Sequence, residues 1–391
     1  MEFKPSAPSS IGAEIELQLL DRNSLDLVDG ILPLLDICPD TSYIKPEYIQ
    51  FTVEVASKVC HGSQELEEHL LDQVTMLQDS AHKLGMRLAG IGTHPFCDRL
   101  GIVTPSPRYA RVEQDTGYVG YSQITYALHV HIGMRSGEEA IALMRRLRPY
   151  LPVLLALSAN SPYWRGLDTG FASYRYRVLM AAHAFGTPPQ FDSWADFEQL
   201  VRTSERAHIF ESFTDMHWDL RPRPDYGTLE LRVMDVQPTV GDTMALVAVT
   251  HALCDYLRTV AAGKAGLEPL PMWLELENHY RASHQGLAAQ CVIDAGGGTR
   301  PMVEVAGRML DAIAPHARTP GAQAQLQRAF QLLREGGNCS RQRALLGEYG
   351  SLKKVVRQLA EQLSEELLQH RSGRPPQAGR SAPPARPRGS S

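Results

Sequence analysis

Four segments of this 391-residue chain alternate large apolar side chains with acidic, amide, histidine or arginine side chains. Successive side chains of a β-strand point to opposite faces, so each segment predicts a strand with one apolar and one polar face. The polar sets are Glu14, Glu16 and Gln18; Gln50, Thr52 and Glu54; His129 and His131; and Glu230 and Arg232. Strands of this kind predict a sheet whose apolar face is covered by helices.

The remaining periodicity predicts the helices that supply this cover. Strands are predicted over 12–20, 49–56, 87–92, 125–133 and 228–236, and helices over 64–84, 137–158, 242–262, 302–315, 322–335 and 351–369. We expect Asp242 to be the N-cap of the third helix and Ser351 to open the last one. The final segment, 371–391, is rich in Pro, Arg, Gly and Ser, which predicts a disordered tail. Residues 1–10 are expected to be flexible, so the folded unit spans 11–370.

The composition argues against several classes of partner. A formal net charge of −5 gives no general electrostatic reason for binding nucleic acid or an anionic membrane. The chain has no stretch of about 18 uncharged apolar residues and its N-terminus has no apolar signal segment, so a cytoplasmic protein is expected. The six cysteines form no C-x-x-C pair, which favours reduced thiols over a disulfide framework.

The polar face admits two interpretations, a solvated surface or the wall of a site. Solvated faces usually carry Lys, Thr and Ser, whereas these strands carry mainly Glu, Gln and His. Four carboxylates on one face would repel one another and raise their pKa values unless cations neutralised them. They are those of Glu14, Glu16, Glu54 and Glu230. Carboxylates with imidazole suit Mg²⁺ or Mn²⁺, and Arg232 would add a fixed positive charge for a phosphate.

Six longer motifs carry a resemblance to a known family. They are IGAEIELQLLDRNSLDL (11–27), GIGTHPF (90–96), ALHVHIG (127–133), LPVLLALSANSPYWRGLDTGFASYR (151–175), GTLELRVMD (227–235) and SRQRALLGEYGSLKKVV (340–356). With these motifs in this order, the chain resembles the carboxylate–amine ligases of the glutamate–cysteine ligase type 2 family, relatives of glutamine synthetase. The resemblance implies an α+β fold with a glutamine-synthetase-like curved antiparallel sheet and helices packed on its outer face.

The resemblance also implies an activity and a set of site residues. The implied reaction is ATP-dependent joining of a small-molecule carboxylate to an amine through an acyl-phosphate, nominally glutamate plus cysteine, with ATP and Mg²⁺ or Mn²⁺ required. The implied metal ligands are Glu14, Glu16, Glu54, His129 and Glu230. Nucleotide or acyl-phosphate contacts are implied for Arg175, Arg221 and Arg232, and catalytic roles for Glu54, Arg175 and Arg232. Neither a P-loop nor a Rossmann motif occurs, so neither kind of nucleotide site is expected.

Several of these residues keep two interpretations. Arg175 and Arg221 could equally be structural ion pairs, and His94 could organise its loop or touch substrate. Trp164 and Trp218 are more often core or pocket-wall aromatics than reacting groups. These alternatives stay open at the level of the sequence.

The two histidines and the segment after Glu54 shape the remaining expectations. We expect His129 to face the metal and nucleotide, and His131 to support the wall of the site. The family leads us to expect Ile-Asn-Thr after Glu54, whereas this chain reads VASKV, which leaves the identity of the carboxylate or amine open. Glu54 could accept the proton of the amine, although other bases stay open.

Two rival functions are a metal-dependent hydrolase and a non-catalytic nucleotide-binding protein. The oligomeric state, including a homodimer, is also open.

Overall fold

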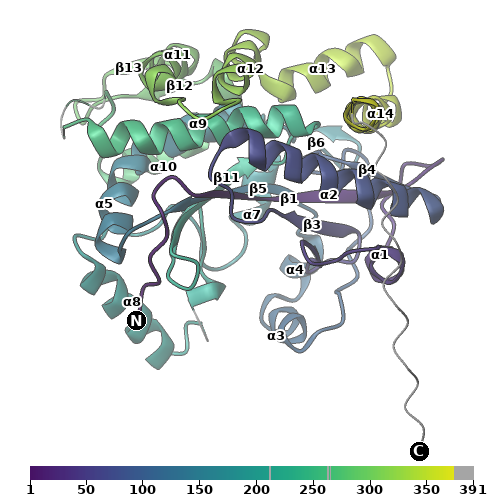
Figure 1. Ribbon diagram of the computed structural model, residues 1–391, viewed down its shortest axis with the longest axis horizontal. Coiled ribbons are helices and arrows are strands. Elements are labelled where there is room, and N and C mark those ends of the chain that lie inside the picture. Colours follow the sequence, from purple (N-terminus) through teal and green to yellow (C-terminus); the bar gives the residue numbers. More distant parts are fainter. Residues whose placement is uncertain (211–212, 262–263, 265, 374–391) are drawn as a thin grey trace, which may run out of the picture.

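The computed structural model describes residues 1–210, 213–261, 264 and 266–373, and its centre is a seven-stranded antiparallel sheet (Figure 1). The strand order is β10-β11-β5-β1-β3-β2, and β4 pairs with the end of β1. The strands are β1 (Ile11–Asp21), β2 (Ile44–Pro46), β3 (Thr52–Ala56), β4 (Met86–Ala89), β5 (Ala127–Gly133), β10 (Leu220–Arg223) and β11 (Thr228–Asp235). The long strand β1 lies at the centre because it pairs with three neighbours.

Helices cover the apolar face of this sheet. In Figure 1, α2 (Ser63–Lys83) and α9 (Val240–Thr259) lie directly on that face, and α11 (Met302–Ile313), α12 (Ala322–Glu335) and α13 (Gly337–Tyr349) lie beyond them. Most side chains of α9 are buried because this helix lies between the sheet and the outer layer. The predicted α+β class, an antiparallel sheet with helices on its outer face, is therefore confirmed.

Shorter elements border the polar face. Figure 1 shows α3 (Pro107–Thr116), α4 (Tyr118–Ser122) and α8 (Trp194–Arg206) on the side of the sheet opposite to α9. The other helices are α1 (Ile31–Ile37), α5 (Gly137–Leu147), α6 (Leu151–Ser158), α7 (Tyr174–Leu179), α10 (Met272–Gln285) and α14 (Leu352–Ser372). Three two-stranded sheets pair β6 (Tyr163–Trp164) with β7 (Leu167–Asp168), β8 (Phe185–Gly186) with β9 (His217–Trp218), and β12 (Gln290–Val292) with β13 (Thr299–Pro301).

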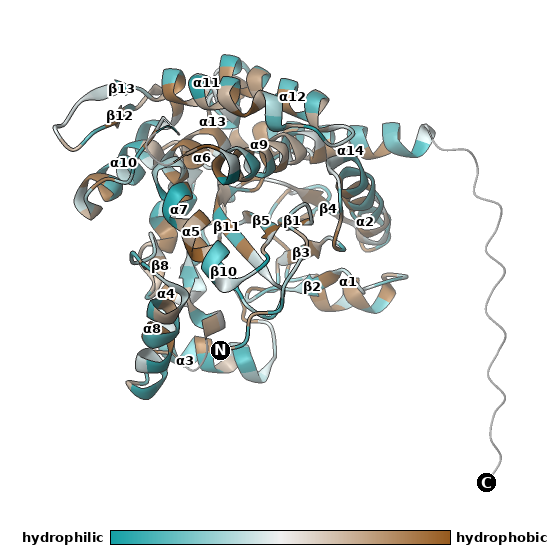
Figure 2. Cartoon of the chain, turned by 60° about the vertical axis from the view of Figure 1, so that its left-hand side comes forward, coloured by the Kyte–Doolittle hydropathy of each residue, from teal (hydrophilic) through white to brown (hydrophobic). Residues whose placement is uncertain are grey.

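The predicted strands are all present, with boundaries that differ by up to three residues. The predicted helix over 137–158 is instead two helices, α5 and α6, separated by a 3₁₀ turn at Arg148–Tyr150. Pro149 and Pro152 lack the N–H that a continuous helix would use, which explains the break. In Figure 2 the second piece, α6, is coloured as strongly apolar, in keeping with the burial of all its residues.

The prediction that Asp242 is an N-cap is wrong. The N-cap of α9 is Thr239, whose side chain accepts a hydrogen bond from the backbone N–H of Asp242 at 3.1 Å. Asp242 lies in the first turn of the helix, where a negative charge also complements the helix dipole. Its carboxylate pairs there with Arg328 Nε at 2.6 Å.

Residues 1–10, predicted to be flexible, form no helix or strand, yet backbone hydrogen bonds join Lys4 to Pro224 and Ser6 to Met134. Helix α14 continues to Ser372, so the predicted tail begins two residues too early. The rest of that prediction, residues 374–391, lies outside the described residues.

All six cysteines are described, and each is a free thiol. None of the helices in the described part of the chain has both the length and the apolar character of a transmembrane span.

Candidate active site on the polar face of the sheet

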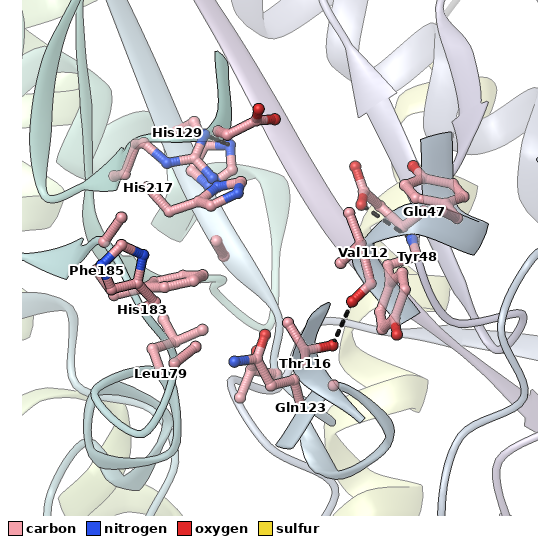
Figure 3. A pocket seen from close by; sticks show the side chains of 18 of the residues that line it. Glu47, Tyr48, Val112, Thr116, Gln123, His129, Leu179, His183, Phe185 and His217 are labelled. Carbon is pink, nitrogen blue, oxygen red and sulfur yellow. Dashed lines mark hydrogen bonds between the residues drawn. The ribbon is translucent and has the colours of Figure 1, made fainter. Parts of the chain in front are cut away.

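The polar face of the sheet lines a cleft of about 1200 Å³. Two segments close this space, α3 with α4 on one side and residues 179–186 on the other. Figure 3 shows Glu47 and Tyr48 facing His129 and His217 across it. The polar face is therefore an enclosed wall and not an open solvated surface.

Strand register brings the predicted acids and the first histidine together. Glu16 of β1 lies opposite Glu54 of β3, which lies opposite Lys45 of β2. Two residues away along β1, Glu14 lies opposite His129 of β5. Because residues two apart on a strand share a face, all of these side chains meet at the same part of the cleft.

A second row continues across the sheet and ends in arginine. His131 of β5 lies opposite Glu230 of β11, which lies opposite Arg221 of β10. Glu230 is fully buried, and its carboxylate accepts hydrogen bonds from Arg221 Nε and Arg232 Nη1, each at 2.6 Å. Burial alone would raise the pKa of Glu230, but these guanidinium groups outweigh it and hold the pKa well below its ordinary value. Glu230 is therefore an anion whose charge is already paired.

A β-bulge interrupts β11 at Arg232, a residue that lines the cleft. The register of β11 against β5 shifts between Leu231 and Met234, so Arg232 and Val233 together oppose His129. Leu231 and Met234 both remain in the hydrophobic core, while Arg232 lines the cleft. A regular strand would place Leu231 and Met234, three residues apart, on opposite faces, so the bulge is what keeps both in the core. Arg232 shares the polar face with Glu230 through the regular alternation.

The acids on β1 and β3 carry more negative charge than their surroundings neutralise. Burial raises the pKa of Glu54 to about 8, and the carboxylates of Glu14 and Glu47 add to this effect. Burial raises the pKa of Glu16 to about 7, against the lowering effect of two nearby arginines. The Lys45 ammonium, 3.1 Å from Glu54 Oε1, compensates only part of the charge. A bound cation would displace the protons that these raised pKa values retain.

His129 is a neutral imidazole at the base of the cleft. Burial and the charge of Arg232 lower the pKa of His129 to about 4. Its Nδ1 lies 3.3 Å from Glu14 Oε2 and 3.4 Å from Arg232 Nη1. A neutral ring keeps a lone pair that can bind a metal ion at neutral pH.

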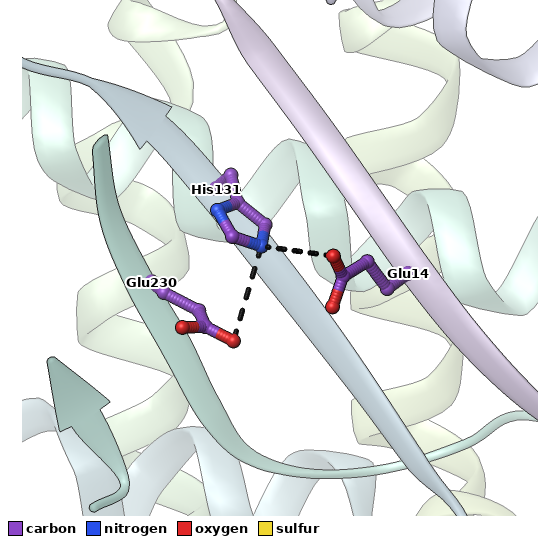
Figure 4. Close-up of side chains that lie close together, drawn as sticks. All are labelled: Glu14, His131 and Glu230. Carbon is purple, nitrogen blue, oxygen red and sulfur yellow. Dashed lines mark ion pairs between the residues drawn. The ribbon is translucent and has the colours of Figure 1, made fainter. Parts of the chain in front are cut away.

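His131 lies between two carboxylates (Figure 4). Its Nε2 is 3.6 Å from Glu14 Oε1 and 3.9 Å from Glu230 Oε1, and its Nδ1 is 3.0 Å from Thr228 Oγ1. Burial would raise the pKa of Glu14, but the interactions of its carboxylate with His129 and His131 outweigh burial and lower that pKa. Glu14 is thus the charged acid that joins the two histidines.

Among the residues that the structure describes, two groups of side chains offer ligand atoms close enough for one cation each. In each group the atoms lie within 4.8 Å of one another, and the groups are Glu14, Glu54 and His129, and Glu14, His131 and Glu230. Carboxylate-rich sets with one imidazole suit Mg²⁺ or Mn²⁺. Burial raises the pKa values of Glu16 and Glu54 at the first group, and a bound cation would offset the burial of their negative charge, so the residues present fit the divalent cation that the sequence predicts.

The other predicted arginines, Arg175 and Arg221, form ion pairs, and their contact with a nucleotide stays a prediction. Arg221 is buried in its ion pair with Glu230. Arg175 is also buried, and its Nη1 lies 3.6 Å from Asp235 Oδ1. Both arginines nevertheless line the cleft, so each is an ion-pair partner and part of the wall.

Sequence reasoning missed several charged residues of the cleft. Lys45 and Glu47 line it from β2 and the turn that follows, and Arg108 and Arg111 line it from α3. Burial raises the pKa of Glu47, with a further contribution from Glu16. Lys45 and Glu47 do alternate in the sequence, but a three-residue strand is too short for that signal to be read.

Three residues singled out in the sequence have structural surroundings. His94 is buried, its Nδ1 accepts a hydrogen bond from Cys97 N at 3.0 Å, and its Nε2 lies 3.0 Å from the Leu25 carbonyl. Burial lowers the pKa of His94 to about 4, so this neutral ring organises its loop. Trp164 and Trp218 pack with the hydrophobic core.

Comparison with known sequences gives matches over nearly the whole chain. The profile of glutamate–cysteine ligase family 2 matches residues 10–361. A protein of Trichormus variabilis assigned as glutamate–cysteine ligase 2 is 44% identical over 370 residues, which cover 94% of this chain and 96% of the relative. A protein of Bdellovibrio bacteriovorus with the same assignment is 36% identical over 369 residues, covering 93% and 97% of the two chains.

Solved structures share the fold at low sequence identity. The glutamate–cysteine ligase of Francisella tularensis, in complex with AMP, matches with a TM-score of 0.65 and 13% identity, covering 95% of this chain and 93% of that one. A bifunctional glutathione synthetase from Pasteurella multocida matches with a TM-score of 0.67 and 14% identity, covering 92% of this chain and 52% of that one. At such identities the likeness establishes a common architecture.

Proposed function

This chain belongs to glutamate–cysteine ligase family 2 and is therefore an ATP-dependent carbon–nitrogen ligase, and we propose that it forms an amide through an acyl-phosphate. In the proposed reaction a carboxylate oxygen of the first substrate attacks the γ-phosphorus of ATP, and ADP leaves. The nitrogen of an amine then attacks the acyl carbon, phosphate leaves, and the amine loses a proton.

The observation that carries this proposal is the meeting of surplus acids with fixed arginines in one enclosed cleft. Glu16 and Glu54 have raised pKa values because they are buried and the positive charges nearby do not outweigh this burial. Arg232 and Arg221 lie on the same face, two and three strands away from β1, where a phosphate chain would meet positive charge. A cleft with anionic and cationic walls suits a nucleotide that arrives with a divalent cation.

The residues of the first ligand group would hold that cation. Glu14, Glu54 and His129 supply ligand atoms within 4.8 Å of one another, and Glu16 lies beside them. A bound Mg²⁺ or Mn²⁺ would shield the negative charge of the phosphates. Arg232 would orient a phosphate oxygen, and Glu54 would accept the proton of the attacking amine.

The substrate pair is proposed from the assignments of the relatives. These name glutamate and cysteine, so a γ-glutamyl reaction is the first to test. The segment after Glu54 departs from the family pattern, and it places Ala56 opposite Glu14 at the edge of the polar face. A methyl group offers no hydrogen bond there, so a panel of carboxylates and amines should accompany the nominal pair.

The decisive measurement is ADP release with each substrate present alone and with both together. Release that rises only when ATP, a divalent cation, a carboxylate and an amine are all present supports the ligase. Metal-dependent cleavage that is indifferent to ATP would point to a hydrolase. Nucleotide binding without turnover would point to a binding protein, and either of these results would contradict the proposal.

Glu16→Gln tests the acidic cleft directly. The substitution keeps the side-chain volume but removes a charge, so we expect weaker Mn²⁺ binding and a rate about a hundredfold lower. Glu65→Gln is the matched control, because Glu65 pairs with Lys58 on the surface at 2.8 Å. Unchanged cation dependence in Glu16→Gln would remove this residue from the site.

A further inference from the structure

The two carbonyl groups of the β-bulge accept hydrogen bonds from one guanidinium group, while the N–H of Arg232 donates to the carbonyl of Asp219 at 2.8 Å. Arg175 Nη1 donates to the carbonyl of Val233 at 3.3 Å, and its Nη2 donates to the carbonyl of Arg232 at 3.1 Å. These are the two residues that oppose His129 in the bulge. A bulge leaves backbone groups outside the regular ladder, and Arg175 satisfies the two carbonyls.

Arg175 is in turn oriented by a buried carboxylate. Asp235 is fully buried, with Oδ1 3.6 Å from Arg175 Nη1. The same Oδ1 accepts a hydrogen bond from Ser173 Oγ at 2.8 Å. Its Oδ2 accepts hydrogen bonds from Ser161 Oγ at 2.7 Å and from the backbone N–H of Asn160 at 2.9 Å. Both oxygens are therefore fixed, which fixes the side of the carboxylate that faces Arg175.

The surrounding backbone leaves this network no room to rearrange. A Cβ atom added to Gly92 would lie 2.8 Å from Asp235 Oδ2 and 3.0 Å from Ser161 Cβ. A Cβ atom added to Gly90 would lie 2.0 Å from the carbonyl oxygen of Gln237. Close approach of this glycine-containing segment encloses the carboxylate, so the network is a rigid support.

We propose that Asp235 is a positioning residue that acts through Arg175 to hold the bulge of β11 and so aim Arg232 at the nucleotide. Three steps connect them: Asp235 orients the guanidinium of Arg175, Arg175 binds the carbonyls of the bulge, which include that of Arg232, and this fixes the backbone from which the Arg232 side chain enters the cleft. The inference rests on the proposed function, since it takes a nucleotide phosphate as the group that Arg232 meets. It also assigns a common purpose to two sequence motifs, residues 151–175 and 227–235.

The test compares binding of a non-hydrolysable ATP analogue with Mg²⁺ by calorimetry, which needs no turnover. We expect Arg232→Lys and Asp235→Asn each to weaken binding about tenfold, while the double variant is little weaker than Arg232→Lys alone. In turnover, Asp235→Asn should raise the KM for ATP and leave the KM for the amine unchanged.

Ser173→Ala provides a milder variant should Asp235→Asn fail to fold. It removes one hydrogen bond to Asp235 Oδ1, so we expect a smaller loss of affinity that again disappears in the Arg232→Lys background. Ser158→Ala is the matched control, because Ser158 is equally buried in the same segment but its hydroxyl bonds to the carbonyl of Leu155. It should leave binding unchanged.

Two results would overturn the proposal, and they differ in what else they overturn. The positioning role fails, and the proposed function stands, if Arg232→Lys weakens binding but the Asp235 and Ser173 variants do not. The same conclusion follows if those variants weaken binding equally in the unaltered protein and in Arg232→Lys. If Arg232→Lys leaves binding unchanged, the phosphate contact fails, and the positioning role fails with it.

Discussion

Lys45 and a divalent cation would compete for the same carboxylate. The Lys45 ammonium lies 3.1 Å from Glu54 Oε1, yet about half of the Lys45 side chain is exposed at the edge of the sheet. Burial would lower the pKa of Lys45, but the charge of Glu54 outweighs it and raises that pKa. The ammonium is therefore fully charged at neutral pH and repels any cation bound at Glu54.

Lys45→Met removes this competitor and should tighten Mn²⁺ binding by about five- to tenfold, the effect of one charge a few ångströms away in a partly solvated site. Calorimetric titration of the protein with Mn²⁺ and no nucleotide measures the change. Lys58→Met is the control, because Lys58 pairs with Glu65 on the surface at 2.8 Å. Weaker Mn²⁺ binding in Lys45→Met would mean that Lys45 supports the cation site.

The two histidines give a second prediction at this scale. His129 belongs to the ligand group that lines the cleft, whereas His131 lies beside Glu230, whose charge the arginines pair. We therefore expect His129→Ala to lower ATP-coupled ADP release more than His131→Ala does. Equal activity in His129→Ala and the unaltered protein would remove this histidine from the metal site, even if the ligase activity were demonstrated.

The sequence can predict a residue of this site only where the strand that carries it is long enough to show alternation. Alternation over five or more residues assigns Glu14, Glu54 and His129 to one face, because period 2 leaves no other choice. Lys45 escaped prediction because its strand has three residues and includes Pro46, and Glu47 escaped it because it follows that short strand. A proline in so short a run reads as a turn.

At the scale of elements, sequence patterns predict regular structure and miss the places where distant residues alter it. Period 2 identified β11, but the bulge depends on Arg175 and Asp235, which no local pattern connects. Likewise the start of α9 was placed at Asp242, although Thr239 has the capping geometry. Thr and Asp three residues apart are both good caps, so composition alone does not choose between them.

The start of α9 also depends on a distant helix, which gives a prediction at this scale. The Glu366 carboxylate of α14 accepts hydrogen bonds from the backbone N–H groups of Val240 and Gly241, both at 2.7 Å. Glu366→Ala leaves these two donors without their partner and should lower the free energy of unfolding by about 1–2 kcal/mol. Chemical denaturation measures this change.

The neighbouring Glu365→Ala is the matched control for that experiment. Glu365 is exposed on the same turn of α14, so its removal should change the free energy of unfolding by no more than about 0.5 kcal/mol. An equal loss of stability in both variants would show that helix propensity or surface charge, and not the cap of α9, is responsible.

At the scale of the whole molecule, one sheet separates a hydrophobic core from a charged cleft. Helices such as α2 and α9 cover the apolar face, and this division follows from the two-faced strands that the sequence predicts. The elements that enclose the cleft were not predicted. No residue of α3 is buried, and residues 179–186 are mostly irregular, so neither segment has the apolar periodicity on which such predictions rest.

The raised pKa values of the acids in this cleft should make the free energy of unfolding of the whole protein depend on pH. In the folded chain the pKa of Glu16 is about 7 and that of Glu54 about 8, compared with an ordinary value of 4.5. Between these values the folded chain binds more protons than the unfolded chain does, so the free energy of unfolding falls as pH rises. The lowered pKa of His129, about 4, acts in the opposite direction but only below pH 6.5.

We therefore expect the Tm of the metal-free protein to fall by a few degrees from pH 6.5 to 8.5. Added Mg²⁺ should raise the Tm more at pH 8.5 than at pH 6.5. The reason is that a cation binds the ionised carboxylates and must displace protons at lower pH. Differential scanning calorimetry with and without Mg²⁺ measures both effects. Glu16→Gln should flatten both dependences, since it removes one of the two titrating groups. A Tm that rises with pH over this range would show that Glu16 and Glu54 are ionised without a cation, and the charge surplus that favours metal binding would then be absent.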